Sequence, residues 1–316
     1  MKLKGINHVA IVGTGMIGSS QAALFTGHGY KTTMYAVNDE EAAKGIKQYE
    51  GFFDVLLEKE LVTQDEIARC RRYLNTTQDY RDIADADFII ECVPEDLELK
   101  HSVYREIEKN CTNFKAVIST TSAKSADDLA RGFTTHKDKI MVAHPFYPPH
   151  LILFVEIVKN DFTSDEAVRT AYDILESCGR KPIVANKSVP GFVANRLQHA
   201  LVREAAYMVD QGIASAADVD KALMYSFAPR YSVVGLFEHQ DAAGLDLVKS
   251  IHDYLLPDLC TQKHTPDLIA KHVEKGELGM KTGKGIHDWP QEKQKEFHEK
   301  AAAPYFKFFN WDIPAE

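Results

Sequence analysis

Two residues that could exchange protons, His144 and Glu156, stand twelve positions apart in the chain. His144 follows a β-rich run that ends at Ala143, and ligands of open α/β folds bind at the carboxyl edge of the sheet. Glu156 interrupts the apolar run 153–158, where a buried carboxylate is costly unless it is paired. A carboxylate bonded to one imidazole nitrogen fixes the tautomer and leaves the other nitrogen to exchange a proton with a substrate. Spacing alone leaves a core histidine beside an outward-facing glutamate equally open.

The segment 13–18 has the spacing GxGxxG between a predicted strand and a predicted helix. In a βαβ unit the first glycine makes the tight turn, the second lets a diphosphate approach the backbone, and the third permits close helix–strand contact. The N-terminus of the helix then offers unpaired N–H groups to the phosphates. The spacing therefore predicts a dinucleotide site made by Gly13, Thr14, Gly15, Met16, Ile17 and Gly18.

The acidic residue that usually holds the adenosine ribose about 20 residues further on is missing. Ala36 stands at that position, with Asn38, Asp39 and Glu40 just after it, and no Arg nearby indicates a 2′-phosphate site. NAD is the predicted cofactor. Because no carboxylate at Ala36 repels a 2′-phosphate, we expect only a modest preference over NADP.

The elements that must position these residues alternate between strand and helix. Short β-rich runs separated by helical stretches predict a doubly wound parallel sheet, in a Rossmann domain over residues 1–187. The charged stretch from Glu40 to Arg72 is too long for one crossover helix and predicts a helical hairpin. After the Pro190-Gly191 break, apolar residues recur at three- and four-residue spacing and no strand pattern follows, which predicts an all-helical domain over 188–316. The expected strands cover 8–12, 31–37, 87–90, 116–118, 139–142, 154–158 and 182–185.

Composition excludes several classes of protein. The 316 residues are 45% hydrophobic and 26% charged, and the net charge of -9 has the wrong sign for neutralising nucleic-acid phosphates. No apolar run approaches the roughly 20 residues that a membrane helix needs, and the first residues do not resemble a signal peptide. The five cysteines are widely spaced without a CxxC pair, and the histidines lack metal-site spacing. We expect a cytoplasmic enzyme with no metal, no membrane partner and no nucleic-acid partner.

Several further motifs occur in a fixed order along residues 5–289. Together with the glycine loop, they resemble the L-3-hydroxyacyl-CoA dehydrogenase family, including its lambda-crystallin (L-gulonate 3-dehydrogenase) and carnitine dehydrogenase branches. The resemblance implies an NAD-dependent oxidoreductase that forms a homodimer. These motifs are ECVPE at 91–95 followed by Lys100, STTS at 119–122, HPFYPP at 144–149, PGFVANR at 190–196 and GMKTGKG at 279–285.

The resemblance also implies roles for individual residues. His144 would be the general acid/base and Glu156 its orienting partner, while Ser122 and Asn195 would hold the reacting oxygen of the substrate. Asn195 has a plainer interpretation as a helix cap. The implied cofactor contacts near the nicotinamide and its ribose, some of which could be ordinary surface charges, are Val93, Glu95, Lys100 and Lys281.

Two departures and one arginine bear on the substrate. Tyr147 stands where the family typically has Asn, and Ala36 where it has Asp, which keeps a non-catalytic, crystallin-like protein open. The segment 228–235 resembles the lambda-crystallin branch, and its Arg230 could hold a free carboxylate by two parallel hydrogen bonds. We therefore expect a small 3-hydroxy acid. The alternative is a 3-hydroxyacyl-CoA thioester, with an adenosine phosphate bound by Arg69, Arg71 and Arg72 of the projecting hairpin.

Overall fold

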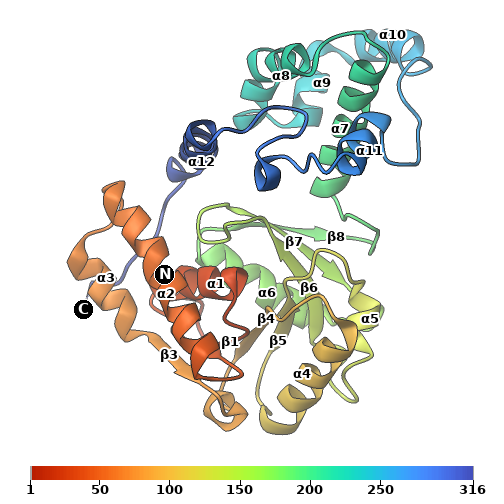
Figure 1. Ribbon diagram of the computed structural model, residues 1–316. Helices are drawn as coiled ribbons and strands as arrows, with labels where there is room; N and C mark the ends of the chain where they lie inside the picture. The colour runs from red at the N-terminus through yellow and green to blue at the C-terminus, as the bar shows by residue number, and fades with distance from the viewer. Residues whose placement is uncertain (1, 316) are drawn as a thin grey trace. The chain divides into compact units, whose positions relative to one another are not determined.

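The computed structural model describes residues 2–315, which form two compact units (Figure 1). The first unit contains the chain up to Val193 and again from Ala302 onward, and the second runs from Ala194 to Ala301. The sequence places the boundary six residues earlier, after Lys187, and assigns the whole of 188–316 to the second domain. The end of the chain instead belongs to the first unit.

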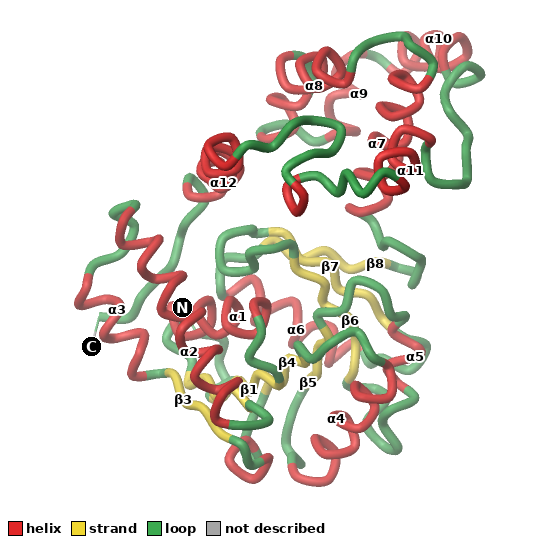
Figure 2. Tube along the Cα trace, viewed as in Figure 1, coloured by secondary structure: helices red, strands yellow, loops and turns green. Residues whose placement is uncertain are grey.

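An eight-stranded sheet forms the centre of the first unit (Figure 2). Its order is β3-β2-β1-β4-β5-β6-β7-β8, and every neighbouring pair is parallel except β6 and β7, which are antiparallel. The predicted doubly wound Rossmann sheet is confirmed, with β3 and the antiparallel pair as features that the sequence analysis missed. The strands are β1 His8–Val12, β2 Lys31–Tyr35, β3 Leu74–Thr77, β4 Phe88–Glu91, β5 Ala116–Ser119, β6 Ile140–Pro145, β7 Phe154–Lys159 and β8 Lys181–Ala185.

Helices cover both faces of this sheet. The alternating side chains of β1 enter two separate buried clusters, Val9 and Ile11 in one, Ala10 and Val12 in the other. The first cluster is covered by α1, α2, α3 and α6, and the second by α4 and α5. Helices α2 and α3 are the predicted hairpin. The elements are α1 Met16–Gly27, α2 Asp39–Glu58, α3 Gln64–Arg72, η1 Tyr80–Ile83, α4 Leu97–Asn110, α5 Ala126–Ala130 and α6 Asp165–Ser177.

The second unit is built from helices, as its sequence pattern predicts. Two isolated β-bridges, Gly279 with Lys284 and Lys284 with Asp288, fold the GMKTGKG segment into a tight loop. Its last helix continues into the first unit. The elements are α7 Ala194–Asp210, α8 Ala216–Tyr225, η2 Ala228–Ser232, α9 Leu236–Ala243, α10 Leu245–Leu255, α11 Asp267–Glu274, η3 Met280–Thr282 and α12 Gln291–Phe306.

The C-terminal residues pack against the first unit around Trp311. The Trp311 ring lies 5.6 Å from the ring of Phe53 and 6.1 Å from that of His28, centroid to centroid. A Cβ at Gly27 would lie 2.3 Å from the indole, so only glycine leaves room for this contact. The tail is therefore fitted into the first unit's packing.

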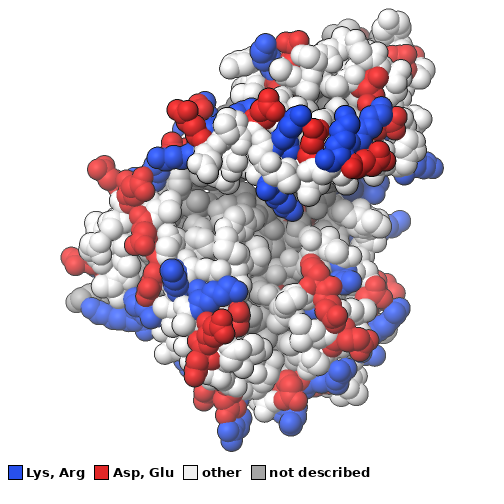
Figure 3. All heavy atoms as spheres, in the orientation of Figure 1, with Lys and Arg blue, Asp and Glu red and all other residues white. Residues whose placement is uncertain are grey.

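Charged side chains of both signs occur on the surface of the protein. Basic and acidic side chains are interspersed over the face that Figure 3 shows, in keeping with the net charge of -9. Between residues 2 and 315, no helix combines the length and apolarity needed to cross a bilayer.

Candidate functional site

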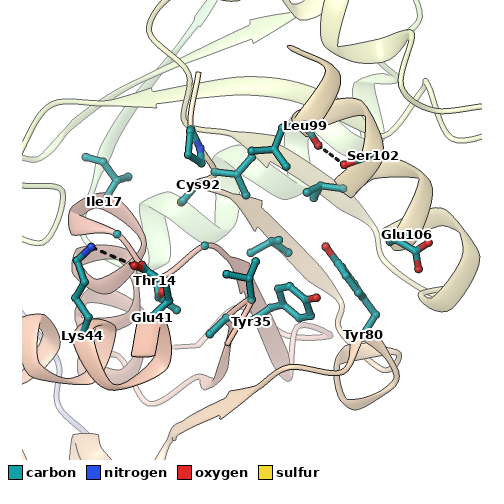
Figure 4. Close-up of a pocket in the computed structure, with 18 of the residues that line it drawn as sticks. Thr14, Ile17, Tyr35, Glu41, Lys44, Tyr80, Cys92, Leu99, Ser102 and Glu106 are labelled. Carbon is teal, nitrogen blue, oxygen red and sulfur yellow. Dashed lines mark hydrogen bonds and ion pairs between the residues drawn. The ribbon is translucent and has the colours of Figure 1, made fainter. Parts of the chain in front are cut away.

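A cavity of about 1070 Å³ opens over the carboxyl ends of β1, β2 and β4 (Figure 4). It is lined by the glycine loop 13–17, by residues 35–37 at the end of β2, by residues 92–94 after β4 and by one side of α4. The ends of parallel strands at which the chain order reverses are where doubly wound folds bind dinucleotides.

The three glycines of the loop have distinct reasons to be glycine. Gly13 has φ +114°, and a Cβ there would lie 2.7 Å from the carbonyl oxygen of Cys92. A Cβ at Gly18 would lie 2.0 Å from the carbonyl oxygen of Gly13, so helix and loop could not approach. A Cβ at Gly15 would meet nothing within 4 Å, which leaves open space where a diphosphate would contact the backbone. Since α1 begins without a side-chain cap, its first N–H groups remain available, and the loop fits a bound dinucleotide.

The loop after β4 is joined to the loop after β5 through Glu95. The Glu95 carboxylate accepts hydrogen bonds from the Thr121 hydroxyl at 2.7 Å and from the Ser122 N–H at 3.0 Å. Lys100 Nζ lies 3.8 Å from Glu95 Oε2, the same oxygen that accepts the Thr121 hydroxyl. The structure thus brings together three residues that the sequence names separately, Glu95, Lys100 and Ser122.

Beneath this loop lies a buried carboxylate that sequence reasoning missed, Glu91 at the end of β4. It is fully buried and accepts four hydrogen bonds of 2.6–2.8 Å. Lys100 is 1% exposed, so its ammonium is held mainly by Glu91. An acid at the end of an apolar strand was the available signal, and it is similar to the acid within an apolar run that singled out Glu156. The four donors are the Lys100 ammonium, the Tyr104 and Ser119 hydroxyls and the Val93 N–H.

His144 and Glu156 form the pair that their spacing suggested. They are directly opposite in the antiparallel ladder of β6 and β7, so their side chains project on the same face of the sheet. His144 Nδ1 lies 3.2 Å from Glu156 Oε2, and the other carboxylate oxygen accepts the Val193 N–H at 2.7 Å. Glu156 is fully buried and His144 is 8% exposed. Glu156 therefore does not face outward, and the catalytic role of the pair stays a prediction.

Two aromatic rings enclose the imidazole. The centroid of His144 lies 5.4 Å from that of Phe146 and 5.7 Å from that of Phe192. Phe192 is buried and has φ +46°, a backbone conformation that is uncommon for a bulky residue and is often found at functional sites. With Nδ1 engaged by Glu156, Nε2 is the imidazole nitrogen left for a proton exchange.

The remaining predicted residues lie in the second unit. Asn195 is in the first turn of α7, Arg230 is exposed in η2 and contacts the His239 ring, and Lys281 is exposed in η3. Their roles in binding stay predictions. In the first unit, Tyr147 is half exposed.

Three weakly acidic side chains that line the cofactor cavity, Cys92, Tyr35 and Tyr80, are uncharged at neutral pH. Burial raises the pKa of the Cys92 thiol to about 12, and burial also raises the pKa of Tyr35 and of Tyr80. The Tyr35 and Tyr80 rings lie 4.1 Å apart at the adenosine end of the cavity. Within residues 2–315, no cluster of His, Cys, Asp and Glu has the makings of a metal site.

Comparison with known families follows the two units. The model of the 3-hydroxyacyl-CoA dehydrogenase NAD-binding domain matches residues 8–189, and that of the C-terminal domain matches residues 191–289. The chain belongs to the 3-hydroxyacyl-CoA dehydrogenase family. It is an NAD-dependent dehydrogenase that acts on a CH–OH group, as the resemblance implied.

Individual relatives span several activities. The chain is 34% identical to L-carnitine dehydrogenase of Oceanobacillus iheyensis over 75% of this chain and 76% of that protein. It is 30% identical to the human lambda-crystallin homolog over 75% of each chain. Among solved structures, 5-formyl-3-hydroxy-2-methylpyridine 4-carboxylic acid 5-dehydrogenase, an NAD⁺-dependent dismutase, superposes with a TM-score of 0.84 at 27% identity. That match covers 96% of this chain and 97% of the other.

Proposed function

We propose that the protein interconverts a small 3-hydroxy acid and its 3-oxo acid, with His144 as the general acid/base. The observation that carries this proposal is the buried contact of His144 Nδ1 with the Glu156 carboxylate, which leaves the imidazole Nε2 unengaged by that carboxylate. A histidine held in this way can remove the proton of a substrate hydroxyl.

The reaction divides between the cofactor and the chain. NAD, held by the glycine loop 13–18, would supply the acceptor for the hydride of the alcohol carbon. His144 Nε2 takes the hydroxyl proton, so that the C–OH becomes C=O as hydride and proton leave. Glu156, held by the Val193 N–H, stabilises the imidazolium that forms. Ser122 and Asn195 hold the reacting oxygen, and Val93, Glu95, Lys100 and Lys281 act on the nicotinamide side.

A free acid, rather than a thioester, is favoured by Arg230 and by the relatives. The guanidinium can bind a carboxylate through two parallel hydrogen bonds, which a thioester cannot accept in the same way. The names of two relatives, L-carnitine dehydrogenase and 5-formyl-3-hydroxy-2-methylpyridine 4-carboxylate 5-dehydrogenase, are those of enzymes acting on free carboxylates.

The thioester alternative rests on another relative and on α3. The chain is 26% identical to a probable 3-hydroxybutyryl-CoA dehydrogenase of Bacillus subtilis over 90% of its length. The predicted phosphate-binding arginines lie in the last turn of α3, where Arg69 is 4.0 Å from Glu66 and Arg71 is 3.7 Å from Glu50. These carboxylates offset part of the positive charge that a CoA phosphate would need.

A screen separates the candidates. Purified protein is assayed with short 3-hydroxy acids and with 3-hydroxyacyl-CoA thioesters, following reduced nicotinamide at 340 nm. The proposal expects turnover of at least one free acid, with Arg230→Lys and Arg230→Met raising the KM for that acid. Efficient turnover of a thioester, with none of any free acid, would refute it. No turnover of either class, with NAD still bound, would favour the non-catalytic alternative.

We propose that the chain forms a homodimer through its second unit and acts in the cytoplasm. Apolar side chains on α7, α9 and α10 are exposed, and a second copy of the same face would cover them. The five cysteines are free thiols, which suits a reducing compartment. Light scattering during size-exclusion chromatography measures the mass in solution and tests the dimer.

A further inference from the structure

The adenosine end of the cofactor cavity lacks a carboxylate at the usual place. Ala36 follows β2 and is 2% exposed. The next polar groups already have partners: the Asn38 side chain caps α2 by accepting the Glu41 N–H, and the Asp39 carboxylate accepts the Gln78 amide. The hydroxyls of an adenosine ribose would need another acceptor there.

Glu41 is the acid that α2 contributes to the lining of this cavity (Figure 4). It lies in the first turn of α2, and its side chain is 36% exposed. Its carboxylate oxygen accepts a hydrogen bond from Lys44 Nζ at 3.3 Å, and Lys44 also lines the cavity. Glu40, its neighbour in the same turn, is exposed and is not part of the lining.

Helix α2 is fixed against the glycine loop. A Cβ at Gly45 would lie 2.7 Å from the Thr14 Cβ, so the two backbones approach closely. The Ser19 hydroxyl lies 3.1 Å from the carbonyl oxygens of both Thr14 and Gly45. The first turns of α2 therefore hold a set position beside the diphosphate-binding loop, and Glu41 is held with them.

We propose that Glu41 takes the place of the missing acid at Ala36, holding the adenosine ribose hydroxyls of NAD and repelling the 2′-phosphate of NADP. Lys44 acts as a positioning residue that keeps the Glu41 carboxylate turned toward the cavity. The proposal rests on the cofactor of the family and not on the identity of the substrate.

The charges around the first turn of α2 favour NAD, which has no 2′-phosphate, over NADP. Lys44 and Arg105 are the cations of the lining, and Glu41 and Glu106 are its acids. Lys44 is already paired with Glu41, and Asp39 and Glu40 add two negative charges to the same helical turn. A 2′-phosphate would add roughly two negative charges beside the first turn of α2. Lys44, the nearby cation of this helix, is already paired, so the added charge would be repelled.

This changes the expectation drawn from Ala36 alone. A missing acid at that position predicted partial tolerance of NADP. An acid five residues further along, in the first turn of α2, supplies the same repulsion, so we expect strong discrimination.

Direct titration tests the proposal without any substrate. The full chain is titrated with NAD and with NADP by isothermal calorimetry. The Kd ratio, the Kd for NADP divided by the Kd for NAD, is then compared among variants. Wild type should bind NAD at least tenfold more tightly. Glu41→Gln should weaken NAD about tenfold through loss of charge-assisted hydrogen bonds, and should lower the Kd ratio by at least tenfold. The Glu41 side chain does not form the helix cap, so α2 should remain intact.

Glu40→Gln is the matched control, because it removes the same charge from the same turn but outside the cavity. It should leave the ratio within twofold of wild type. Placing an acid at the usual position, in Ala36→Asp with Glu41→Gln, should restore the preference for NAD. Equal binding of NAD and NADP by wild type, or equal shifts in Glu41→Gln and Glu40→Gln, would overturn the role of Glu41. Failure of wild type to bind either dinucleotide would overturn the cofactor itself.

Discussion

The two units bury their side chains in opposite ways. In the first unit, two apolar clusters fill both faces of the sheet, and even charged groups such as Glu91, Lys100 and Glu156 lie inside it with partners. Of residues 194–301, the apolar side chains that are buried are Ala206 and Cys260. Large side chains such as Phe237 and Tyr254 are more than 80% exposed there. The first unit carries its own core, whereas the second leaves large apolar side chains exposed, which the proposed association of two copies would cover.

The largest expected effect comes from breaking that association. In Ile251→Glu with Leu255→Glu, two charges stand one turn apart on α10, at positions 48% and 41% exposed. Burying these charges in an apolar interface is costly, so we expect the dimer to become a monomer at micromolar concentration. Phe162→Glu, at a position 62% exposed in the first unit, is the control and should leave the mass unchanged. A dimer that survives the α10 changes would place the interface elsewhere.

The second prediction concerns buried charge in the first unit. Glu91→Gln leaves the Lys100 ammonium buried with a weakened partner, which should cost about 3 kcal/mol of unfolding free energy. Urea titration followed by Trp311 fluorescence, in a Trp289→Phe background, reports on the first unit. Lys271→Met removes an exposed pair of the second unit, Lys271 with Asp267 at 3.6 Å, and should leave the midpoint unchanged. Equal effects of the two changes would mean that the Glu91 network does not hold the loop.

The third prediction separates chemistry from folding within the first unit. His144→Ala should lower kcat about 100-fold, the usual worth of general acid/base catalysis, with the Kd for NAD little changed. Glu156→Gln should also lower kcat, because the imidazolium loses its counter-ion. If turnover were unchanged in His144→Ala, the mechanism would be wrong. A Glu156→Gln variant that only loses stability would make Glu156 structural.

What the sequence could predict depended on whether the signal was local. The glycine loop and the α2–α3 hairpin follow from periodicity and turn residues, and both are present. The pairing of His144 with Glu156 depends on strand register, and residues twelve apart meet because β6 and β7 are antiparallel, which the pattern of parallel strands did not indicate.

Other features depended on contacts between distant segments. Glu91 ends an apolar strand, which marks it as a buried acid, but most of its donors come from α4 and β5, so its own segment does not identify them. Glu41 is one charge in an acidic helical turn, and only the cavity distinguishes it from Glu40. The tail joins the first unit because Gly27 leaves space for Trp311, a fit that no sequence pattern encodes.

The smallest expected effect is a dependence of the first unit's stability on pH. Burial lowers the pKa of His150 to about 3 and that of His28 to about 4, from an ordinary 6.5. Both rings are neutral in the folded chain, while the unfolded chain gains protons as the pH falls below 6.5. The contribution of these two histidines to the free energy of unfolding is therefore fully present above pH 6.5. Below that pH it declines by about 1.4 kcal/mol per pH unit for each histidine, until the folded pKa is reached. Urea midpoints read from Trp311, which contacts both rings, should fall between pH 7 and pH 5.5. In His150→Asn, the part of the slope of unfolding free energy against pH that comes from these two histidines should drop by about half. A wild-type midpoint that did not change with pH would show that these rings are not held neutral.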